Sequence, residues 1–280
     1  MVDYTLVYIG PIGFSGSTLL DVALAQGDDV FSMGEVFQIA EWMRENHLCT
    51  CRKPIGECAF WPGVLKDITP NALATPAGIG REDLRARTIS TDEETSRYVA
   101  AHWDLIDRVA EASGARLIID GSKHLWRLKL LADARPDKIK FIQLCRDPLA
   151  VMQSAKIPKA RLAVSSTAMT KPSSGLRTLT KWILSHRAAR QFADQNRIPR
   201  LSVSYDRLTH EPEKSLSAIC DWIGMSYDPA MLTLKTPDLH NIAGSRWRLT
   251  KDQSTISPAS DTGRNSLISK TATALAGLSR

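Results

Sequence analysis

The sequence predicts a doubly wound α/β protein, in which a parallel β-sheet carries helices on both faces. Three observations support this fold class. Short apolar segments rich in β-branched residues recur along the chain, segments with helical periodicity separate them, and each apolar segment ends in a turn. The predicted strands cover residues 4–9, 116–120, 138–145 and 200–205. Because parallel sheets bind ligands at the carboxyl ends of their strands, function is expected in the turns that follow these segments.

The predicted helices lie between these strands. One helix is expected to begin near Ser17, shortly after the first strand. The others are indicated by apolar residues at spacings of three and four, which form one face of a helix. These sets are Val99, Trp103, Ile106 and Ala110; Leu176, Leu179 and Ile183; and Leu216, Ile219, Cys220 and Ile223.

Length and composition favour a single domain. The chain has 280 residues, of which 43% are hydrophobic, and this is enough to bury one sizeable core. We expect the domain to cover residues 1–250, followed by a weakly packed, Ser/Thr-rich tail over residues 251–280. Two segments rich in Pro, Ser, Thr and Ala, residues 70–95 and 155–174, are candidate acceptor-binding loops.

Charge and hydropathy restrict the partners. Lysine and arginine number 36 against 30 acidic residues, and the resulting net charge of +6 suits an anionic small molecule. The basic residues form no long run, which argues against nucleic acid or a polybasic membrane patch as the partner. No apolar run approaches the ~20 residues of a membrane span, and the N-terminus lacks the pattern of a signal peptide. A cytoplasmic protein is therefore expected, of undetermined oligomeric state.

The turn after the first strand has the features of an anion site. Residues 10–18, Gly-Pro-Ile-Gly-Phe-Ser-Gly-Ser-Thr, open a helix whose first backbone N–H groups have no partner within the helix. An ordinary strand-to-helix turn capped by Ser or Thr is the alternative. Loops that bind nucleoside triphosphates carry Lys before the Ser/Thr, and Ser17 stands at that position here. The sequence thus argues against ATP or GTP hydrolysis but keeps donors for a 5′-phosphate.

This turn resembles the 5′-phosphosulfate loop of sulfotransferases that use 3′-phosphoadenosine 5′-phosphosulfate (PAPS). The matching residues are Ser15, Gly16, Ser17 and Thr18, and the resemblance implies a P-loop-like fold with PAPS as co-substrate. In much of the family Lys or Arg precedes this motif and assists the leaving group. Phe14 occupies that position here, so the resemblance implies that the cation comes from elsewhere in the chain.

Further segments extend the resemblance to residues 4–248. Arg146 follows a strand and Ser154 lies eight residues later, which resembles the family's 3′-phosphate segment; an arginine fork and a hydroxyl suit a phosphate. The same segment also reads as a helix start, with Asp147 as N-cap and Pro148 in the first turn. The resemblance adds Tyr205 and a C-terminal loop that closes over the nucleotide to the cofactor-binding residues. That loop contributes Gly244, Ser245 and Arg246, and the resemblance implies that Gly244 and Arg246 approach the 3′-phosphate and the adenine.

Sulfuryl transfer needs a base for the acceptor hydroxyl and positive charge near the departing phosphate. The resemblance to glycan and tyrosylprotein enzymes implies Glu35 as the base, and the resemblance to aryl and steroid enzymes implies His124 as its rival. Lys123 is the expected replacement for the cation absent at Phe14. Each residue also has a structural alternative: a helix-start glutamate, a structural histidine and a solvated surface lysine.

Five cysteines leave an odd number, which argues against a scaffold stapled wholly by disulfides. Cys145 and Cys220 lie in apolar segments. His47, Cys49, Cys51 and Cys58 could supply an imidazole and three thiolates to zinc, but Cys-x-Cys followed by one cysteine lacks the paired spacing of structural zinc sites. Similar cysteine loops before Phe-Trp, here Phe60 and Trp61, occur in bacterial relatives and favour a local structural loop or a disulfide. We assign no metal to the reaction.

The functional prediction is transfer of a sulfuryl group from PAPS to a hydroxyl, with release of adenosine 3′,5′-bisphosphate (PAP). The acceptor is a small or medium molecule, and a glycan, a lipid, a phenol and a secondary metabolite all remain open. Two alternatives of other classes remain. One is a nucleotide kinase or other phosphoryl transferase, which would need magnesium. The other is a PAPS-binding module without turnover.

Overall fold

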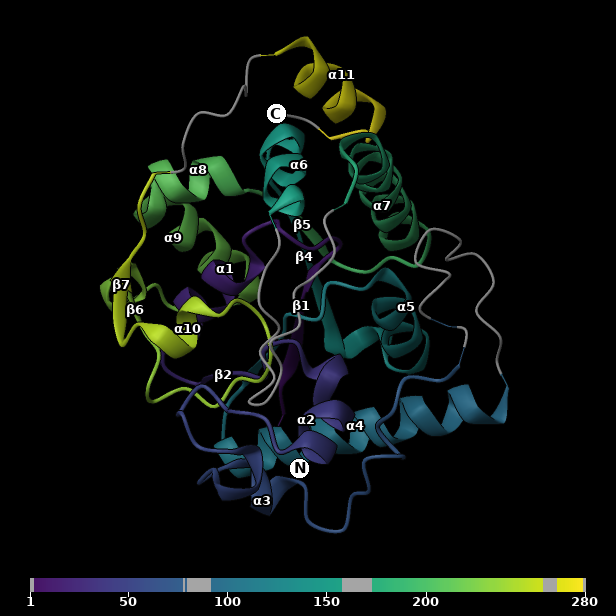
Figure 1. Ribbon diagram of the computed structural model, residues 1–280, viewed down its shortest axis with the longest axis vertical. Helices are drawn as coiled ribbons and strands as arrows, with labels where there is room; N and C mark the ends of the chain where they lie inside the picture. Colours follow the sequence, from purple (N-terminus) through teal and green to yellow (C-terminus); the bar gives the residue numbers. More distant parts are fainter. Residues whose placement is uncertain (1–2, 78, 80–91, 158–172, 259–265, 279–280) are drawn as a thin grey trace.

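A five-stranded parallel sheet forms the centre of the computed structural model, which describes residues 3–77, 79, 92–157, 173–258 and 266–278 (Figure 1). The strand order is β2-β3-β1-β4-β5. The strands are β1 (Thr5–Gly10), β2 (Val30–Ser32), β3 (Leu117–Asp120), β4 (Ile139–Cys145) and β5 (Arg200–Ser204). The predicted fold class and the four predicted strands are confirmed, and β2 is an additional edge strand.

Side chains that alternate along β1 build two cores, one on each face of the sheet. Leu6 and Tyr8 belong to the first core, while Val7 and Ile9 belong to the second. The parallel register pairs Tyr8 with Asp120 on β3 and with Phe141 on β4. Because the central strands are buried on both faces, they read as continuous apolar runs in the sequence.

Helices cover both faces, as the predicted periodicities require (Figure 1). The first core is covered by α2 (Ile39–Glu45), α3 (Trp61–Val64), α4 (Glu93–Ser113), α5 (Leu125–Ala134) and α7 (Gly175–Gln195). The second is covered by α1 (Ser17–Leu24), α8 (Tyr205–His210) and α9 (Pro212–Ile223). The apolar sets predicted in α4 and α9 face these cores. In the α7 set, Leu179 and Ile183 pack against a third, smaller core around Val151 and Trp182, whereas Leu176 is 76% exposed.

Local sequence signals explain where the helices begin and end. Asp92 caps α4 by accepting a hydrogen bond from the Thr95 N–H, and Gly114 ends that helix with a φ of 67°. Helix α6 (Pro148–Lys156) starts with Pro148 in its first turn, and Asp147 accepts from the N–H groups of Leu149 and Ala150. The helix-start interpretation of this segment therefore holds in the structure.

A buried ion pair supports the end of β3. Asp120 and Arg127 are fully buried and lie 2.9 Å apart, Oδ2 to Nε. Arg127 also donates to the Tyr98 hydroxyl at 2.6 Å. The second carboxylate oxygen of Asp120 accepts from the Ser122 N–H at 2.9 Å. This fixes the turn at residues 121–124, which carries two of the predicted catalytic residues.

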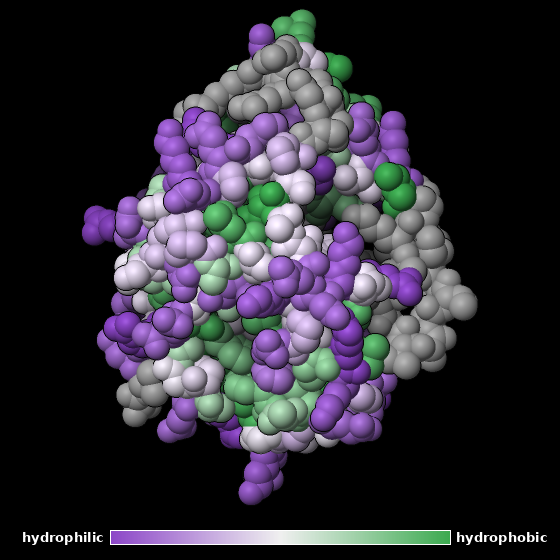
Figure 2. All heavy atoms as spheres, turned by 90° about the vertical axis from the view of Figure 1, so that its left-hand side faces the viewer, coloured by the Kyte–Doolittle hydropathy of each residue, from purple (hydrophilic) through white to green (hydrophobic). Residues whose placement is uncertain are grey.

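Short elements complete the fold. They are the 3₁₀ helices η1 (Val36–Gln38), η2 (Ile55–Glu57), η4 (Pro136–Lys138) and η5 (Pro229–Leu232), the antiparallel pair β6 (Thr233–Lys235) and β7 (Gln253–Thr255), and the helices α10 (Trp247–Thr250) and α11 (Leu267–Leu275). The side of the molecule that carries α8 and α9 is mixed in character, with hydrophilic residues around smaller hydrophobic areas (Figure 2).

The segment expected to form a weakly packed tail contains β7 and α11. Ala272 of α11 and Ala276, the C-cap of that helix, are buried in a cluster with Val151 of α6 and Trp182 of α7. The two candidate acceptor loops are only partly described, because residues 80–91 and 158–172 lie outside the described ranges. Among the helices of those ranges, none combines the length and apolar character needed to cross a membrane.

Candidate active site

The predicted site residues follow the carboxyl ends of all five strands, in an order set by the sheet. Glu35 follows β2, Lys123 follows β3, the loop of residues 10–18 (the anion loop) follows β1, Arg146 follows β4, and Tyr205 follows β5. Because the strands are parallel, these turns lie along one edge of the sheet. The carboxylate and the lysine thus lie on one side of the anion loop, and Arg146 and Tyr205 lie on the other.

The anion loop is held tightly against Tyr205. Gly16 has a φ of 87°, a left-handed conformation that glycine adopts without a steric penalty, and it is the N-cap of α1. A Cβ at Gly16 would lie 2.0 Å from Cε2 of Tyr205, so the ring packs directly on the glycine. Phe14 also has a positive φ of 64°, and its side chain is 37% exposed. The Ser15 hydroxyl donates to the Ile12 carbonyl at 2.8 Å.

Arg146 joins the predicted 3′-phosphate residues to the anion loop. Its Nη1 donates to the Phe14 carbonyl at 3.0 Å and lies 3.4 Å from the Ser154 hydroxyl. The guanidinium carbon lies 4.9 Å from the centre of the Tyr205 ring. Trp182 holds the backbone from behind, since its Nε1 donates to the Arg146 carbonyl at 3.2 Å. The structure therefore brings Arg146, Ser154 and Tyr205 together beside residues 14–16.

Glu35 and Lys123 form an ion pair through Oε1 and Nζ. Their side chains are only 17% and 15% exposed. Backbone contacts bring the two turns together, because the Gly121 N–H donates to the Gly34 carbonyl at 2.8 Å. Lys123 has a φ of 70°, which is uncommon for a residue other than glycine and is typical of functional sites.

His124 lies next to this pair but packs among aromatic rings. Its ring meets the Phe37 ring edge-on at 4.4 Å and tilts against Trp126 at 5.8 Å. Its carbonyl accepts a hydrogen bond from the Tyr8 hydroxyl at 2.7 Å. These contacts hold His124 between Phe37, Trp126 and Tyr8.

The segment of residues 240–248, the closing segment, completes the site. Gly244 has a φ of 88°, and a Cβ added there would lie 3.3 Å from the Thr18 hydroxyl and 3.6 Å from Glu35 Oε1. The Ser245 N–H donates to Thr18 Oγ1 at 3.3 Å. Gly244 and Ser245 therefore contact the anion loop at Thr18. Arg246 is exposed and precedes α10.

Sequence reasoning missed Arg248, whose guanidinium is buried beside Gly244. Its Nη1 donates to the Thr50 hydroxyl at 2.6 Å and to the Asn241 carbonyl at 2.9 Å. Its Nε and Nη2 have no hydrogen-bond partner within the described ranges. Burial lowers the pKa of Arg248 to about 10, although the nearby carboxylates of Glu35 and Asp21 oppose this shift. Arg248 is thus a buried positive group near Glu35.

Asp21 is the second buried charge that the sequence analysis did not find. It accepts hydrogen bonds from the hydroxyl of Ser32 and, at 3.3 Å, from the side-chain amide of Asn241. Burial raises its pKa to about 6, while Ser32, Arg248 and Asn241 act in the opposite direction. Asp21 therefore links α1, β2 and the closing segment.

The cysteines predicted to cluster do so, with a different histidine. Cys49, Cys51 and Cys58 converge with His240, which begins the closing segment. His47 instead packs edge-on against Trp42, with ring centres 4.7 Å apart. His47 is close to the cysteines in the sequence, but its ring packs against Trp42 and is not part of the cysteine cluster.

Comparisons with known proteins identify the family. The model of the sulfotransferase family matches residues 12–229. The sulfotransferase domain of the olefin synthase from Synechococcus PCC 7002 has 22% identity and a TM-score of 0.51, covering 99% of this chain and 95% of that one. The sulfotransferase domain from the curacin biosynthetic pathway has 14% identity and a TM-score of 0.57, covering 99% and 98%. No curated protein matches. The chain therefore belongs to the sulfotransferase family, whose reaction is sulfuryl transfer.

Proposed function

We propose that this protein transfers the sulfuryl group of PAPS to a hydroxyl of a small or medium acceptor and releases PAP. The observation that carries the proposal is the position of Arg146 between the anion loop and Ser154. A nucleotide with phosphates at both 5′ and 3′ positions needs two anion sites on one edge of the sheet. The helix start at Gly16 suits the 5′-phosphosulfate, and Arg146 with Ser154 suits the 3′-phosphate.

The reaction needs positive charge near the bridging oxygen as the bond from sulfur to that oxygen breaks. Lys123 is the proposed source, because the anion loop has Phe14 where much of the family has a basic residue. The turn that carries Lys123 lies next to the anion loop, since a Cβ at Gly10 would lie 3.2 Å from the Lys123 carbonyl oxygen, and the ion pair with Glu35 holds the ammonium. Donors that are already in position stabilise developing charge without a reorganisation cost.

Glu35 is the proposed general base. A Cβ at Gly244 would lie 3.6 Å from Glu35 Oε1 and 3.3 Å from the Thr18 hydroxyl, so the carboxylate lies close to the start of α1. An acceptor hydroxyl bound next to the 5′-phosphosulfate would therefore meet this carboxylate. A carboxylate in this position takes the proton of the acceptor hydroxyl while the oxygen attacks sulfur. The aromatic packing of the His124 ring supports a structural role for that residue.

Calorimetry with PAP tests the donor site. PAP should bind much more tightly than adenosine 5′-phosphosulfate, which lacks the 3′-phosphate. Arg146→Ala removes a charge-assisted contact and should weaken PAP binding by roughly ten- to a hundredfold. Arg116→Ala is the matched control, since Arg116 forms a surface ion pair with Asp29 away from these turns. Unchanged PAP affinity in Arg146→Ala would refute the 3′-phosphate assignment.

Turnover tests the base and separates the alternatives. A panel of phenols, sterols, sugars and alkyl alcohols is incubated with labelled PAPS, and Glu35→Gln should lower kcat by ~10²–10⁴ with little change in PAP affinity. His124→Asn should have a milder effect, and the reverse result would make His124 the base. Transfer should proceed without added magnesium; strict dependence on magnesium with ATP as donor would indicate phosphoryl transfer instead. Binding of PAP without transfer to any acceptor would indicate a binding module.

A further inference from the structure

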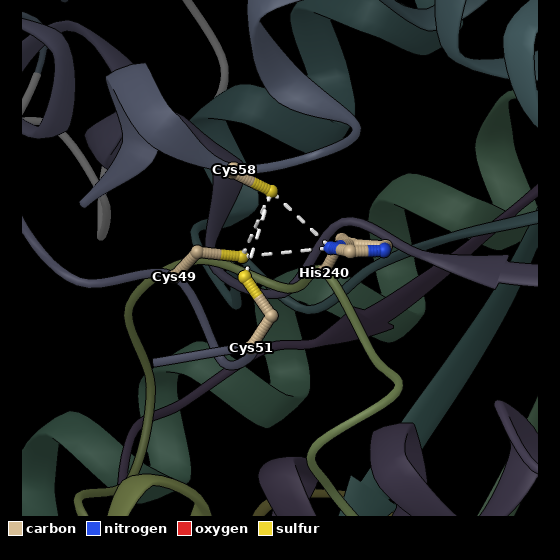
Figure 3. A group of neighbouring side chains, drawn as sticks. All are labelled: Cys49, Cys51, Cys58 and His240. Atoms are coloured by element: carbon tan, nitrogen blue, oxygen red, sulfur yellow. Dashed lines mark hydrogen bonds between the residues drawn. The ribbon is translucent and has the colours of Figure 1, made fainter. Parts of the chain in front are cut away.

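Four side chains that commonly bind metals meet beside the closing segment (Figure 3). They are Cys49, Cys51, Cys58 and His240, and their ligand atoms all lie within 4.8 Å of one another. Cys49 and Cys58 are buried, while Cys51 and His240 are half-buried. Figure 3 shows the three sulfurs and Nδ1 of His240 turned toward a common centre.

The distances between these atoms fit a tetrahedral zinc site. Zinc–sulfur bonds of ~2.3 Å and zinc–nitrogen bonds of ~2.0–2.1 Å place neighbouring ligands roughly 3.6–3.8 Å apart. The Cys58 sulfur lies 3.6 Å from that of Cys49 and 3.7 Å from that of Cys51. Nδ1 of His240 lies 3.2 Å from the Cys58 sulfur and 4.0 Å from the Cys49 sulfur. The two distances between sulfurs fall within this range, and of the two distances to Nδ1 one is shorter and one is longer.

A disulfide explains this arrangement less well. A disulfide joins two sulfurs at about 2.05 Å, whereas Cys49, Cys51 and Cys58 are free in the structure. Any one disulfide would also leave a third thiol and an imidazole beside it with no function. Three thiolates and one imidazole, in contrast, are a complete ligand set for a structural zinc ion.

We infer that Cys49, Cys51, Cys58 and His240 bind one structural zinc ion. The four protein ligands fill a tetrahedral shell and leave no open position for substrate, which distinguishes a structural site from a catalytic one. Each thiol that binds gives its proton to solvent and becomes a thiolate ligand, so the site holds zinc without any change of oxidation state. This inference is independent of the proposed donor and acceptor.

The groups around the cluster suit a metal site. The Phe60 N–H donates to the Cys58 sulfur at 3.4 Å, as outer groups commonly do to a bound thiolate. The Phe60 ring stacks on the His240 ring at 5.6 Å with an interplanar angle of 13°. Nε1 of Trp61 donates to the His240 carbonyl at 2.6 Å. These contacts fix the orientation of the imidazole.

The zinc ion would tie the cysteine loop to the closing segment. Thr50, between two of the cysteines, donates to the Asn241 carbonyl at 2.7 Å and accepts from Arg248. Asn241 follows His240 directly and contacts Asp21. The metal thus holds the segment that brings Gly244 to Glu35 and Thr18, and its loss should loosen this part of the site.

Metal analysis of the full chain tests the inference. The protein is expressed with added zinc chloride and freed of loose metal by gel filtration, and zinc is then measured by mass spectrometry. About one zinc per chain is expected. Cys58→Ser and His240→Ala should lose most of it, whereas His240→Cys supplies a new thiolate and should keep it. Cobalt chloride added to metal-free protein should give the intense visible bands of a tetrahedral cobalt–thiolate site.

Two matched controls should keep their zinc. His47→Gln removes the other histidine near the cysteine loop, and Cys145→Ser removes a cysteine that also lies near a histidine, 3.7 Å from His186. Wild-type protein without zinc would overturn the inference, with either free thiols or a disulfide found by intact mass. Zinc retained in His240→Ala and lost in His47→Gln would overturn the ligand set. If Cys58→Ser does not fold, the wild-type content and the pair at His240 still decide the question.

Discussion

Replacing Gly16 by alanine tests the contact between the anion loop and Tyr205. The new Cβ would lie 2.0 Å from Cε2 and 2.2 Å from Cδ2 of the ring, so Tyr205 or the loop must move. The left-handed backbone adds a penalty of about 1–2 kcal/mol for a residue with a Cβ. Overpacking adds about 1–3 kcal/mol. The lower entropy of the unfolded chain offsets about 0.4–1 kcal/mol of this loss.

The net loss of stability in Gly16→Ala should therefore be roughly 1–5 kcal/mol. Each kcal/mol lowers the Tm of a protein of this size by roughly 2–4 °C, so a fall of several degrees is expected in thermal unfolding. Displacement of Tyr205 also disturbs Arg146, whose guanidinium carbon lies 4.9 Å from the ring centre. Calorimetry should then show PAP affinity reduced by at least about tenfold, equivalent to ~1.4 kcal/mol.

Gly13→Ala provides the matched control in the same loop. A Cβ at Gly13 would meet nothing within 4 Å, and its backbone is not left-handed. Its stability should change by no more than about 1 kcal/mol. If Gly16→Ala unfolds at the same temperature as Gly13→Ala and binds PAP equally well, the close packing of Tyr205 on the loop does not matter to the folded protein or to its donor site.

Three further predictions concern charges in and behind the site. Lys123→Met should lower kcat for transfer from labelled PAPS by at least about a hundredfold, with a smaller effect on PAP affinity; equal losses of both would indicate a binding role. Burial lowers the pKa of His186 to about 3. As pH falls below about 6.5, this histidine therefore gains a proton in the unfolded state but stays neutral in the folded state. Stability should then fall by about 1.4 kcal/mol per pH unit, and His186→Gln should remove this component in urea unfolding between about pH 7 and pH 5. Asp21 acts in the opposite direction, because its raised pKa of about 6 stabilises the fold at low pH and this contribution disappears as pH rises through that value. Asp21→Asn should therefore lose stability more steeply than wild type as the pH falls. If its stability falls less steeply with pH than that of wild type, the raised pKa of Asp21 is contradicted.

The strands and their turns could be predicted because two simple signals coincide. Apolar runs buried on both faces stand out in the sequence, and glycine, arginine and proline mark their ends. Strand β2 was missed because it is only three residues long, although Glu35 in the turn after it was found by resemblance. In α7 the apolar set describes the packed face only in part, because Leu179 and Ile183 pack in a core but Leu176 is exposed. The buried face also contains His186, to which the Gln143 side chain donates at 3.1 Å if Nδ1 is the acceptor. A polar residue with a partner in the core is invisible to hydropathy.

The site residues that the sequence did not reveal are brought into place by contacts between segments far apart in the chain. A single Arg such as Arg248 reads as a solvated surface residue, and only the fold reveals that Thr50 and Asn241 surround it. The same limit applies to the proposed metal ligands. His47 is near the cysteines in sequence, but His240, 182 residues from Cys58, is the one that meets them. Spacing along the chain identifies a metal site only when all of its ligands come from one local segment.

The strand order places the proposed site residues in two groups, one on each side of the anion loop. Arg146 and Tyr205 follow β4 and β5, so changes there should act on donor binding, whereas Glu35 and Lys123 follow β2 and β3, so changes there should act on turnover. The closing segment lies on the β2 side, where Gly34 pairs with Ile242. It therefore lies in the half of the site that carries the proposed base. A metal at its first residue would set the geometry of proton transfer without touching either substrate.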